Sequence, residues 1–169
     1  MKTIQNLLIF MTLGMLVACN GGQELTIDTD KTSEKLPVEV RDTTIENIDW
    51  ELSETFEAGT YTVRGVPNKL GFIDAPFVEN KPQKYMWHFW GDVPKGDLTV
   101  VGIKKGSQGI TPVLMMGKDY VWSYNAPGGP NNGADAHAPS TMKLTEEGSW
   151  ALLVYLGDEY FGQVIVEVK

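Results

Sequence analysis

Residues 149–168 have the sequence SWALLVYLGDEYFGQVIVEV, and they give the clearest indication of the fold. Two runs rich in β-branched and aromatic residues, Ser149–Leu156 and Tyr160–Val168, flank the turn residues Gly157 and Asp158. Runs of this kind on either side of a glycine-containing turn predict a β-hairpin.

Similar short runs recur upstream, separated by clusters of Gly, Pro, Asn and Asp. They are Thr60–Val66, Lys69–Ile73, Lys84–Trp90, Leu98–Lys104, Val113–Met116, Tyr120–Tyr124 and Thr141–Leu144. No stretch of the chain shows sustained helical periodicity. Many short strands with turns between them predict an all-β fold, a two-sheet antiparallel β-sandwich.

One spacing near the hairpin favours an immunoglobulin-like sandwich. Leu144, Gly148, Trp150 and Leu152 follow the pattern of the corner between strands E and F, with Trp150 in the place of the usual tyrosine. Trp87, on the most aromatic run, is then a candidate for the core tryptophan of strand C.

The N-terminus carries the features of a secretory signal. Lys2 precedes an uncharged, mostly apolar stretch, Leu7–Ala18, of only twelve residues, whereas a membrane-spanning helix needs about 20. Residues 16–19, Leu-Val-Ala-Cys, resemble the lipobox of bacterial lipoproteins. The resemblance implies that residues 1–18 are removed and that Cys19 receives diacylglycerol on its thiol and an acyl group on its amine. The alternative is an ordinary secretory peptide with a chance cysteine.

The segment after Cys19, up to residue 48, differs in composition from the remainder of the chain. Residues 20–47 contain no aromatic side chain, and Thr, Ser, Asp, Glu and Lys dominate. We interpret the segment as a flexible tether with a span of roughly 30 Å. The alternative is that Leu36–Val40 forms a first edge strand. Residues 49–169, which hold all five tryptophans, form the folded domain.

The charge of the chain limits its partners. The net charge is −8, and removal of the signal peptide with Lys2 brings it to −9. An acidic surface repels phosphate, so nucleic acid is excluded as a partner. The same charge disfavours a domain that lies flat on anionic lipid.

Several motifs together resemble a known family. They are NKLGFI (68–73), KYMWHFWG (84–91), GADAHAPS (133–140) and the C-terminal segment from Tyr155 to Val168. They resemble a family of uncharacterised lipoproteins of Bacillus-type bacteria that carry a domain of unknown function. The resemblance covers Asp49 to the C-terminus and implies a secreted, immunoglobulin-like domain. It implies no activity and no catalytic residues.

The two histidines of the chain are candidates for a metal site. His88 and His137, with Asp135 or Met86, could bind copper or zinc. The spacing does not require them to meet, because no His-x-His or His-x-x-x-His pair is present. The alternative is that His88 is a core histidine hydrogen-bonded to its surroundings.

A long loop, Asn125–Pro139, is a candidate ligand site. It is rich in Gly, Pro and Asn and contains Asp135 and His137, which could bind a polar small molecule or a peptide terminus. The alternative is a structural crossover between the sheets. Outward-facing Trp90, Trp122 and Tyr124 could form a stacking platform for cell-wall sugars, although such residues more often lie in the core.

A catalytic centre is not indicated. Ser140 lies near His137 and Asp135 in sequence, but Gly-x-Ser-x-Gly and a nucleophile elbow are absent. We therefore expect a non-enzymatic binding module for an envelope protein or a cell-wall component. It would be lipid-anchored at the extracytoplasmic face of the cell membrane, with no cofactor besides the lipid on Cys19. Metal binding is the second hypothesis and a hydrolytic enzyme the third.

Overall fold

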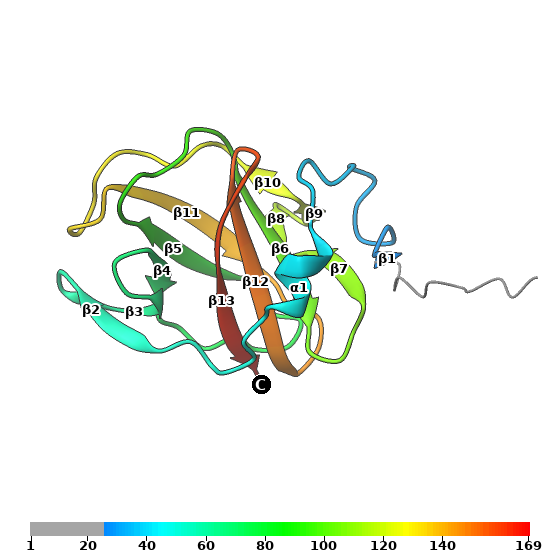
Figure 1. Cartoon of the computed structure of the whole chain (residues 1–169). Helices are drawn as coiled ribbons and strands as arrows, with labels where there is room; N and C mark the ends of the chain where they lie inside the picture. The colour runs from blue at the N-terminus through cyan, green and yellow to red at the C-terminus, as the bar shows by residue number, and fades with distance from the viewer. Residues whose placement is uncertain (1–25) are drawn as a thin grey trace, which may run out of the picture.

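Two β-sheets packed face to face make up the protein in a computed structural model that describes residues 26–169 (Figure 1). Sheet A has the order β1 (Thr26–Ile27), β7 (Gly109–Pro112), β6 (Leu98–Lys104), β12 (Gly148–Leu156) and β13 (Glu159–Val168), with β10 (Ser123–Tyr124) also paired to β6. Sheet B has the order β2 (Thr55–Ala58), β3 (Tyr61–Val66), β4 (Leu70–Ile73), β5 (Gln83–Phe89), β11 (Ala136–Met142), β8 (Leu114–Met116) and β9 (Asp119–Val121). The predicted all-β, two-sheet sandwich is confirmed.

Side-chain alternation along the strands builds the core between the sheets. On β12, Leu152, Val154 and Leu156 face sheet B and are fully buried. On β5, Trp87 and Phe89 face sheet A and are also fully buried. The two central strands therefore place their largest apolar side chains on the same interface.

The predicted C-terminal hairpin is confirmed. β12 and β13 pair antiparallel from Gly148–Val168 to Leu156–Glu159, with one irregularity between Val154 and Tyr155. Gly157 in the turn has φ 58°, and a Cβ there would lie 2.8 Å from the Lys95 carbonyl oxygen. Glycine is therefore required at this turn both for its backbone conformation and for its close neighbour.

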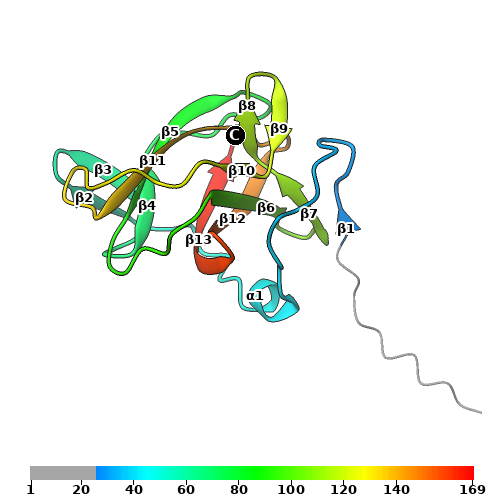
Figure 2. The same cartoon turned by 90° about the horizontal axis from the view of Figure 1, so that it is seen from above.

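The segment predicted to be a flexible tether packs against the outer face of sheet A. We call residues 26–48 the N-terminal arm; it contains β1 and the short helix α1 (Asp42–Glu46). The arm covers a second apolar cluster: buried Ile48, Val101, Ile103, Ile110, Trp122, Ala151, Leu153, Tyr155 and Ile165, with Leu36, Val38, Val40, Ile45 and Trp50 packed against it. Figure 2 shows α1 on the side of sheet A away from sheet B. The prediction of a tether is thus wrong for residues 26–48, because their apolar side chains find a sheet face to cover.

The alternative prediction, an edge strand over Leu36–Val40, is also wrong, because these residues form no ladder. The strand of the arm is β1, which pairs parallel with β7. Leu36, Val38 and Val40 nevertheless pack against the apolar cluster. Every second residue is apolar because this part of the arm is an extended chain that crosses the outer face of the sheet.

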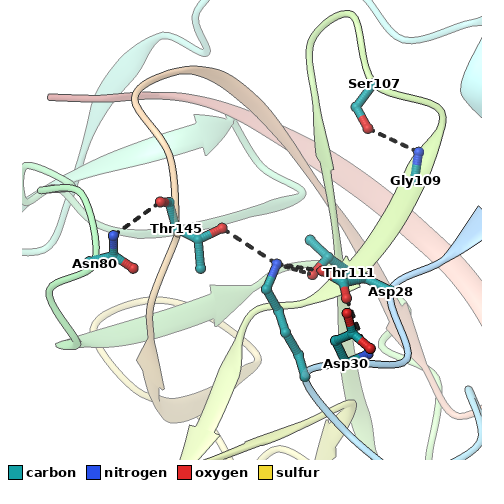
Figure 3. A network of polar contacts seen from close by, with 8 residues as sticks. Asp28, Asp30, Asn80, Ser107, Gly109, Thr111 and Thr145 are labelled. Carbon is teal, nitrogen blue, oxygen red and sulfur yellow. Dashed lines mark hydrogen bonds and ion pairs between the residues drawn. The ribbon is translucent and has the colours of Figure 1, made fainter.

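Polar contacts fix the start of the arm (Figure 3). The Lys31 ammonium lies 2.6 Å from an Asp28 carboxylate oxygen and donates hydrogen bonds to the Thr111 hydroxyl at 3.1 Å and the Thr145 hydroxyl at 3.5 Å. Farther along, the Trp122 indole N–H donates to the Glu34 carbonyl at 3.0 Å. The arm is therefore held to the sandwich by specific contacts as well as by apolar burial.

The predicted loop Asn125–Pro139 is shorter than expected, because Ala136–Pro139 belong to β11. A proline argues against a central strand. β11, however, has a continuous ladder only toward β5, since β8 joins it only at Met142. Pro139 is therefore tolerated in β11, because the edge of this strand away from β5 has no continuous hydrogen-bonded neighbour.

The exposed edge of β13 is closed near its middle. The Ile165 N–H donates to the Ser53 hydroxyl at 2.8 Å, and the Ile165 carbonyl accepts from the Ser53 N–H at 3.1 Å. One residue outside the sheet thus pairs with both backbone groups of this edge-strand residue.

The predicted signal peptide (residues 1–18), the lipidated Cys19 and residues 20–25 of the predicted tether lie outside the described residues. Within residues 26–169, no helix is long and apolar enough to cross a membrane.

Candidate functional site

His88 and His137 lie directly opposite each other on neighbouring strands. They are paired residues in the antiparallel ladder between β5 and β11, so their side chains lie on the same face, the outer face of sheet B. His88 is nevertheless fully buried. The structure therefore brings together the two histidines that the sequence could not place.

A loop after β10 pairs with β11 beside the two histidines. We call residues 125–135 the distal loop; its Gly128 N–H donates to the His137 carbonyl at 2.8 Å, and the His137 N–H donates to the Gly128 carbonyl at 3.3 Å. A Cβ on Gly128 would lie 3.2 Å from Cε1 of His137. The distal loop thus lies in contact with the His137 ring.

The two imidazoles have different hydrogen-bond partners. His137 Nδ1 lies 2.7 Å from the Gly129 carbonyl oxygen and therefore carries the proton and donates. His88 Nε2 lies 3.2 Å from the Asn132 amide nitrogen, so it accepts and the ring proton is on Nδ1, which is buried without a hydrogen-bond partner. Asn132 is a residue of this site that the histidine analysis missed. The signal in the sequence was the Asn132-Gly133 dipeptide, which is typical of turns, and Asn132 does adopt the left-handed conformation (φ 49°).

The surroundings of His88 lower its pKa below the ordinary value of 6.5. Burial is the main cause, because it disfavours the charged ring, and the nearby His137 acts in the same direction. The Met86 backbone, which lies close to the ring but makes no hydrogen bond of standard geometry with it, opposes the shift without reversing it. His88 is therefore a neutral imidazole at physiological pH.

We expect the free energy of unfolding to decrease as the pH falls below 6.5. His88 binds a proton more readily in the unfolded chain, so its contribution is present above pH 6.5 and is lost as the pH falls toward its lowered pKa. The slope from one such group is at most about 1.4 kcal/mol per pH unit. Urea unfolding between pH 7.5 and 5.5, above the range of ordinary carboxylates, measures it. His88→Gln should flatten the profile; an unchanged slope in this variant would contradict the assignment.

Aromatic and acidic residues fix the ends of the distal loop. The Trp90 ring stacks beside His88 with centroids 6.0 Å apart, and its indole N–H donates to the Gly133 carbonyl at 2.8 Å. An Asp135 carboxylate oxygen accepts from the Gly91 N–H at 2.8 Å. Trp90 and Asp135 therefore hold the distal loop to the sheet.

The structure brings together the two histidines of the predicted metal site, but it adds no third ligand. Within residues 26–169, no group of three or more His, Cys, Asp or Glu side chains could hold a metal ion. Asp135 is turned to the Gly91 amide, and each imidazole already has one nitrogen in a hydrogen bond. Two histidines alone do not define the three- or four-ligand zinc site that proteins use.

The predicted sugar platform is wrong, because its tryptophans lie on different layers. Trp122 is 1% exposed and lies under the N-terminal arm on sheet A, whereas Trp90 lies on the outer face of sheet B. The Tyr124 hydroxyl donates to the Met115 carbonyl. Trp122 is therefore a core residue and does not belong to the ligand site predicted with Asp135 and His137.

Ser140 does not combine with His137 and Asp135. Its side chain points to the opposite face of β11, where its hydroxyl accepts a hydrogen bond from the buried Trp87 indole at 3.1 Å. The three residues thus do not form a nucleophile, base and orienting group.

A cavity of about 420 Å³ opens beside His137. Asn125, Ala126 and Gly128 of the distal loop line it on one side and Met116, which is 61% exposed, on another. Among its lining residues, Asp97, Ser123 and His137 can offer a ligand polar contacts, and Met116 can offer apolar contact.

Fold and site together define an all-β sandwich domain with a loop-covered histidine pair on one outer face. Within this class, the chain belongs to the family described as a domain of unknown function (DUF4871), whose model matches residues 40–166. This match supports the predicted resemblance to a family with a domain of unknown function.

The fold is similar to a crystal structure from Bacillus anthracis that carries the provisional description of a lipoprotein. The two share 24% sequence identity with a TM-score of 0.69, over 77% of this chain and 94% of that chain. A comparison with curated proteins found no significant match.

Proposed function

We propose that this protein is a lipid-anchored, extracytoplasmic binding module that contacts an envelope protein or a cell-wall component with the end of the sandwich farthest from its anchor. The observation that carries the binding role is the position of the distal loop relative to the point where the arm begins. Its support comes from the anchor, the strand order and this geometry.

The anchor rests on Cys19. The lipobox-like residues 16–19 precede the described structure by only six residues, 20–25, and the similar Bacillus anthracis structure carries a lipoprotein description. Seven residue steps, from Cys19 to Thr26, span at most about 25 Å when fully extended. Because the arm is packed from Thr26 on, the sandwich would lie close to the lipid headgroups.

The strand order supports an immunoglobulin-like sandwich. β4, β5, β11 and β8 follow the order A-B-E-D, and β7, β6, β12 and β13 follow C′-C-F-G. At the corner between β11 and β12, the Trp150 indole N–H donates to the Glu146 carbonyl at 2.9 Å, as a tyrosine corner does. Trp87 lies on β5, which is strand B in this order, so its prediction as the strand C tryptophan is wrong.

The distal loop and the β2–β3 hairpin form the end that we assign to binding. In Figures 1 and 2 both lie at one end of the sandwich, and β1, where the arm begins, lies at the other. The two segments are neighbours, because a Cβ on Gly59 would lie 3.5 Å from the Asn132 side chain. A membrane anchor at the β1 end would point this pair of loops outward, where a partner can reach them.

The test is affinity capture from solubilised envelopes with the mature, lipid-bearing protein. The variant is Tyr61→Ala combined with Asn131→Ala, both at the distal end, and the control is Ile27→Ala on β1. Tyr61 is 41% exposed and Ile27 45%, so the variant and the control each truncate a large apolar side chain of similar fractional exposure. We expect one partner, retained by wild type and control and reduced at least tenfold by the distal variant, because aromatic anchors dominate interface energies.

Melting temperatures equal to that of the wild type would show that loss of capture reflects the surface. Equal recovery by all three proteins, or recovery of nothing by the wild type, would contradict a distal binding end.

A further inference from the structure

A groove crosses the outer face of sheet B, farther along β5 and β11 than the two histidines. In the ladder between these strands Met86 lies opposite Pro139 and Lys84 lies opposite Thr141. All four residues are two or four positions from the histidine pair, so their side chains share its face. The groove has a volume of about 460 Å³, within the range of ligand sites. We call it the sheet-B groove; it contains no residue of the distal loop or of the β2–β3 hairpin.

The sheet-B groove has a mostly apolar lining. Ile73 on β4, Met86 on β5 and Pro139 on β11 line it across three neighbouring strands, and Ala75 follows β4. Ile73, Ala75 and Met86 are half-buried and Pro139 is exposed, so a ligand can reach all four. The solvated face of an antiparallel sheet is usually polar. A contiguous apolar stretch on such a face is typical of an interaction site.

A single charged group, the Lys84 ammonium, lines the sheet-B groove. Lys84 is exposed and makes no ion pair within residues 26–169. Asp74, which lies between two lining residues in the sequence, does not line the groove and is held by the Arg64 guanidinium at 2.7 Å. The chain has a net charge of −8, so an unpaired cation beside an apolar surface is a local exception. It favours an apolar ligand that carries a carboxylate.

The backbone of Lys84 adds a second polar feature. β4 pairs with β5 only as far as Trp87, so the start of β5 has no ladder on that side. The His137 N–H and C=O face away from β5, because both pair with Gly128, and those of Thr141, four residues on, face the same way. Lys84 lies opposite Thr141 and therefore directs its own N–H and C=O toward the side without a ladder.

The polar groups of the groove favour a peptide over a fatty acid as the carboxylate-bearing ligand. The Lys84 N–H and C=O and the Thr141 hydroxyl can pair with the amide groups of an extended peptide. A hydrocarbon tail would leave all of them unpaired. In a wholly apolar peptide the only carboxylate is the one at the C-terminus, so the single ammonium of the groove matches the end of such a chain.

We propose that the sheet-B groove binds the free C-terminal end of an extended, apolar peptide. The terminal carboxylate contacts the Lys84 ammonium, and the peptide side chains contact Ile73, Met86 and Pro139. The partner is thus a polypeptide whose chain ends in apolar residues. This site is separate from the distal end and does not depend on the function proposed for it.

The experiment is fluorescence anisotropy with a pooled library of tetrapeptides of alanine, valine, leucine and phenylalanine. Each carries fluorescein on its N-terminus and a free carboxyl group at its C-terminus. The protein is the mature chain, residues 19–169, with Cys19→Ala so that no attached lipid competes. We expect binding that weakens at least tenfold when the peptides are amidated at the C-terminus. Lys84→Gln should weaken it as much, because it removes the only cation of the groove, and so should Met86→Asp, because it adds a repelling carboxylate.

The matched control is Lys81→Gln, since Lys81 is also exposed but does not line the groove. It should bind the library as the wild type does. No anisotropy change at millimolar protein would overturn the proposal, as would equal affinity of the Lys84→Gln protein or of the amidated library. Tighter binding of dodecanoate, measured by displacement of the labelled peptides, would assign the groove to a fatty acid and also overturn it. All of these results are distinguishable from failure of the distal capture, because the two sets of variants share no residue.

Discussion

A chain that begins at Asp49 is expected to aggregate or to melt far below the chain that begins at Thr26. Removal of the N-terminal arm exposes the apolar outer face of sheet A, including Trp122, Leu153 and Ile103, all at most 2% exposed in the intact protein. It also removes the burial of the arm's own side chains. Full burial of one large apolar side chain stabilises by about 1.5–3 kcal/mol, and a whole domain is stable by only about 5–15 kcal/mol.

Thermal unfolding followed by circular dichroism, with light scattering for solubility, measures the effect. The matched control is Lys31→Ala in the chain that begins at Thr26, which breaks the polar contacts of the arm but keeps its apolar cover. We expect the control to lose little, because partly exposed ion pairs contribute about 0–1 kcal/mol. If the two chain lengths melt at the same temperature, the arm is a tether as its composition predicts.

Replacement of Cys19 by alanine is expected to abolish lipid attachment and to release the protein from the membrane fraction. The thiol is the only acceptor for diacylglycerol at the predicted cleavage site, because the chain has one cysteine. Each buried acyl methylene contributes about 0.8 kcal/mol, so the loss of two or more chains removes essentially all membrane affinity. Metabolic labelling with an alkyne fatty acid and fractionation of cells measure both effects.

Gly21→Ala is the matched control, since it lies beside the predicted site and leaves the thiol intact. It should retain label and membrane association. Fatty-acid label on the Cys19→Ala protein, or wild-type protein without label, would refute the anchor.

The predicted strands correspond to the structure where the chain pairs locally. β6 matches its predicted range, Leu98–Lys104, and the β12–β13 hairpin is off by one residue at two ends. β2 and β7 were missed, because Thr55–Ala58 and Gly109–Pro112 are short and carry few apolar side chains. Their partners in the ladder, more than their own composition, make them strands.

The candidate site depended on a register that the sequence does not reveal. The alternative interpretation of His88, a core histidine hydrogen-bonded to its surroundings, agrees with its full burial and its contact with Asn132. His137 lies opposite His88 because β11 pairs with β5. Most of β11 was not predicted, because the residues up to Pro139 were predicted to form a loop. The packing of the arm was missed because its polar composition predicts a tether, whereas its spaced apolar side chains, such as Leu36 and Val40, cover the outer face of sheet A.

The pairing of Ser53 with Ile165 has a consequence for the anchored state proposed above, in which copies of the protein would share a membrane. Anchored molecules diffuse in two dimensions and meet more often, and in more similar orientations, than molecules in bulk solution. β13 is a ten-residue edge strand rich in valine and isoleucine, the type of edge that invites pairing with a second copy. Because Ser53 already occupies both backbone groups of Ile165, two such edges cannot form a continuous ladder. In that proposed state Ser53, together with the bridge between Phe77 and Val168, would hinder edge-to-edge pairing of neighbouring copies.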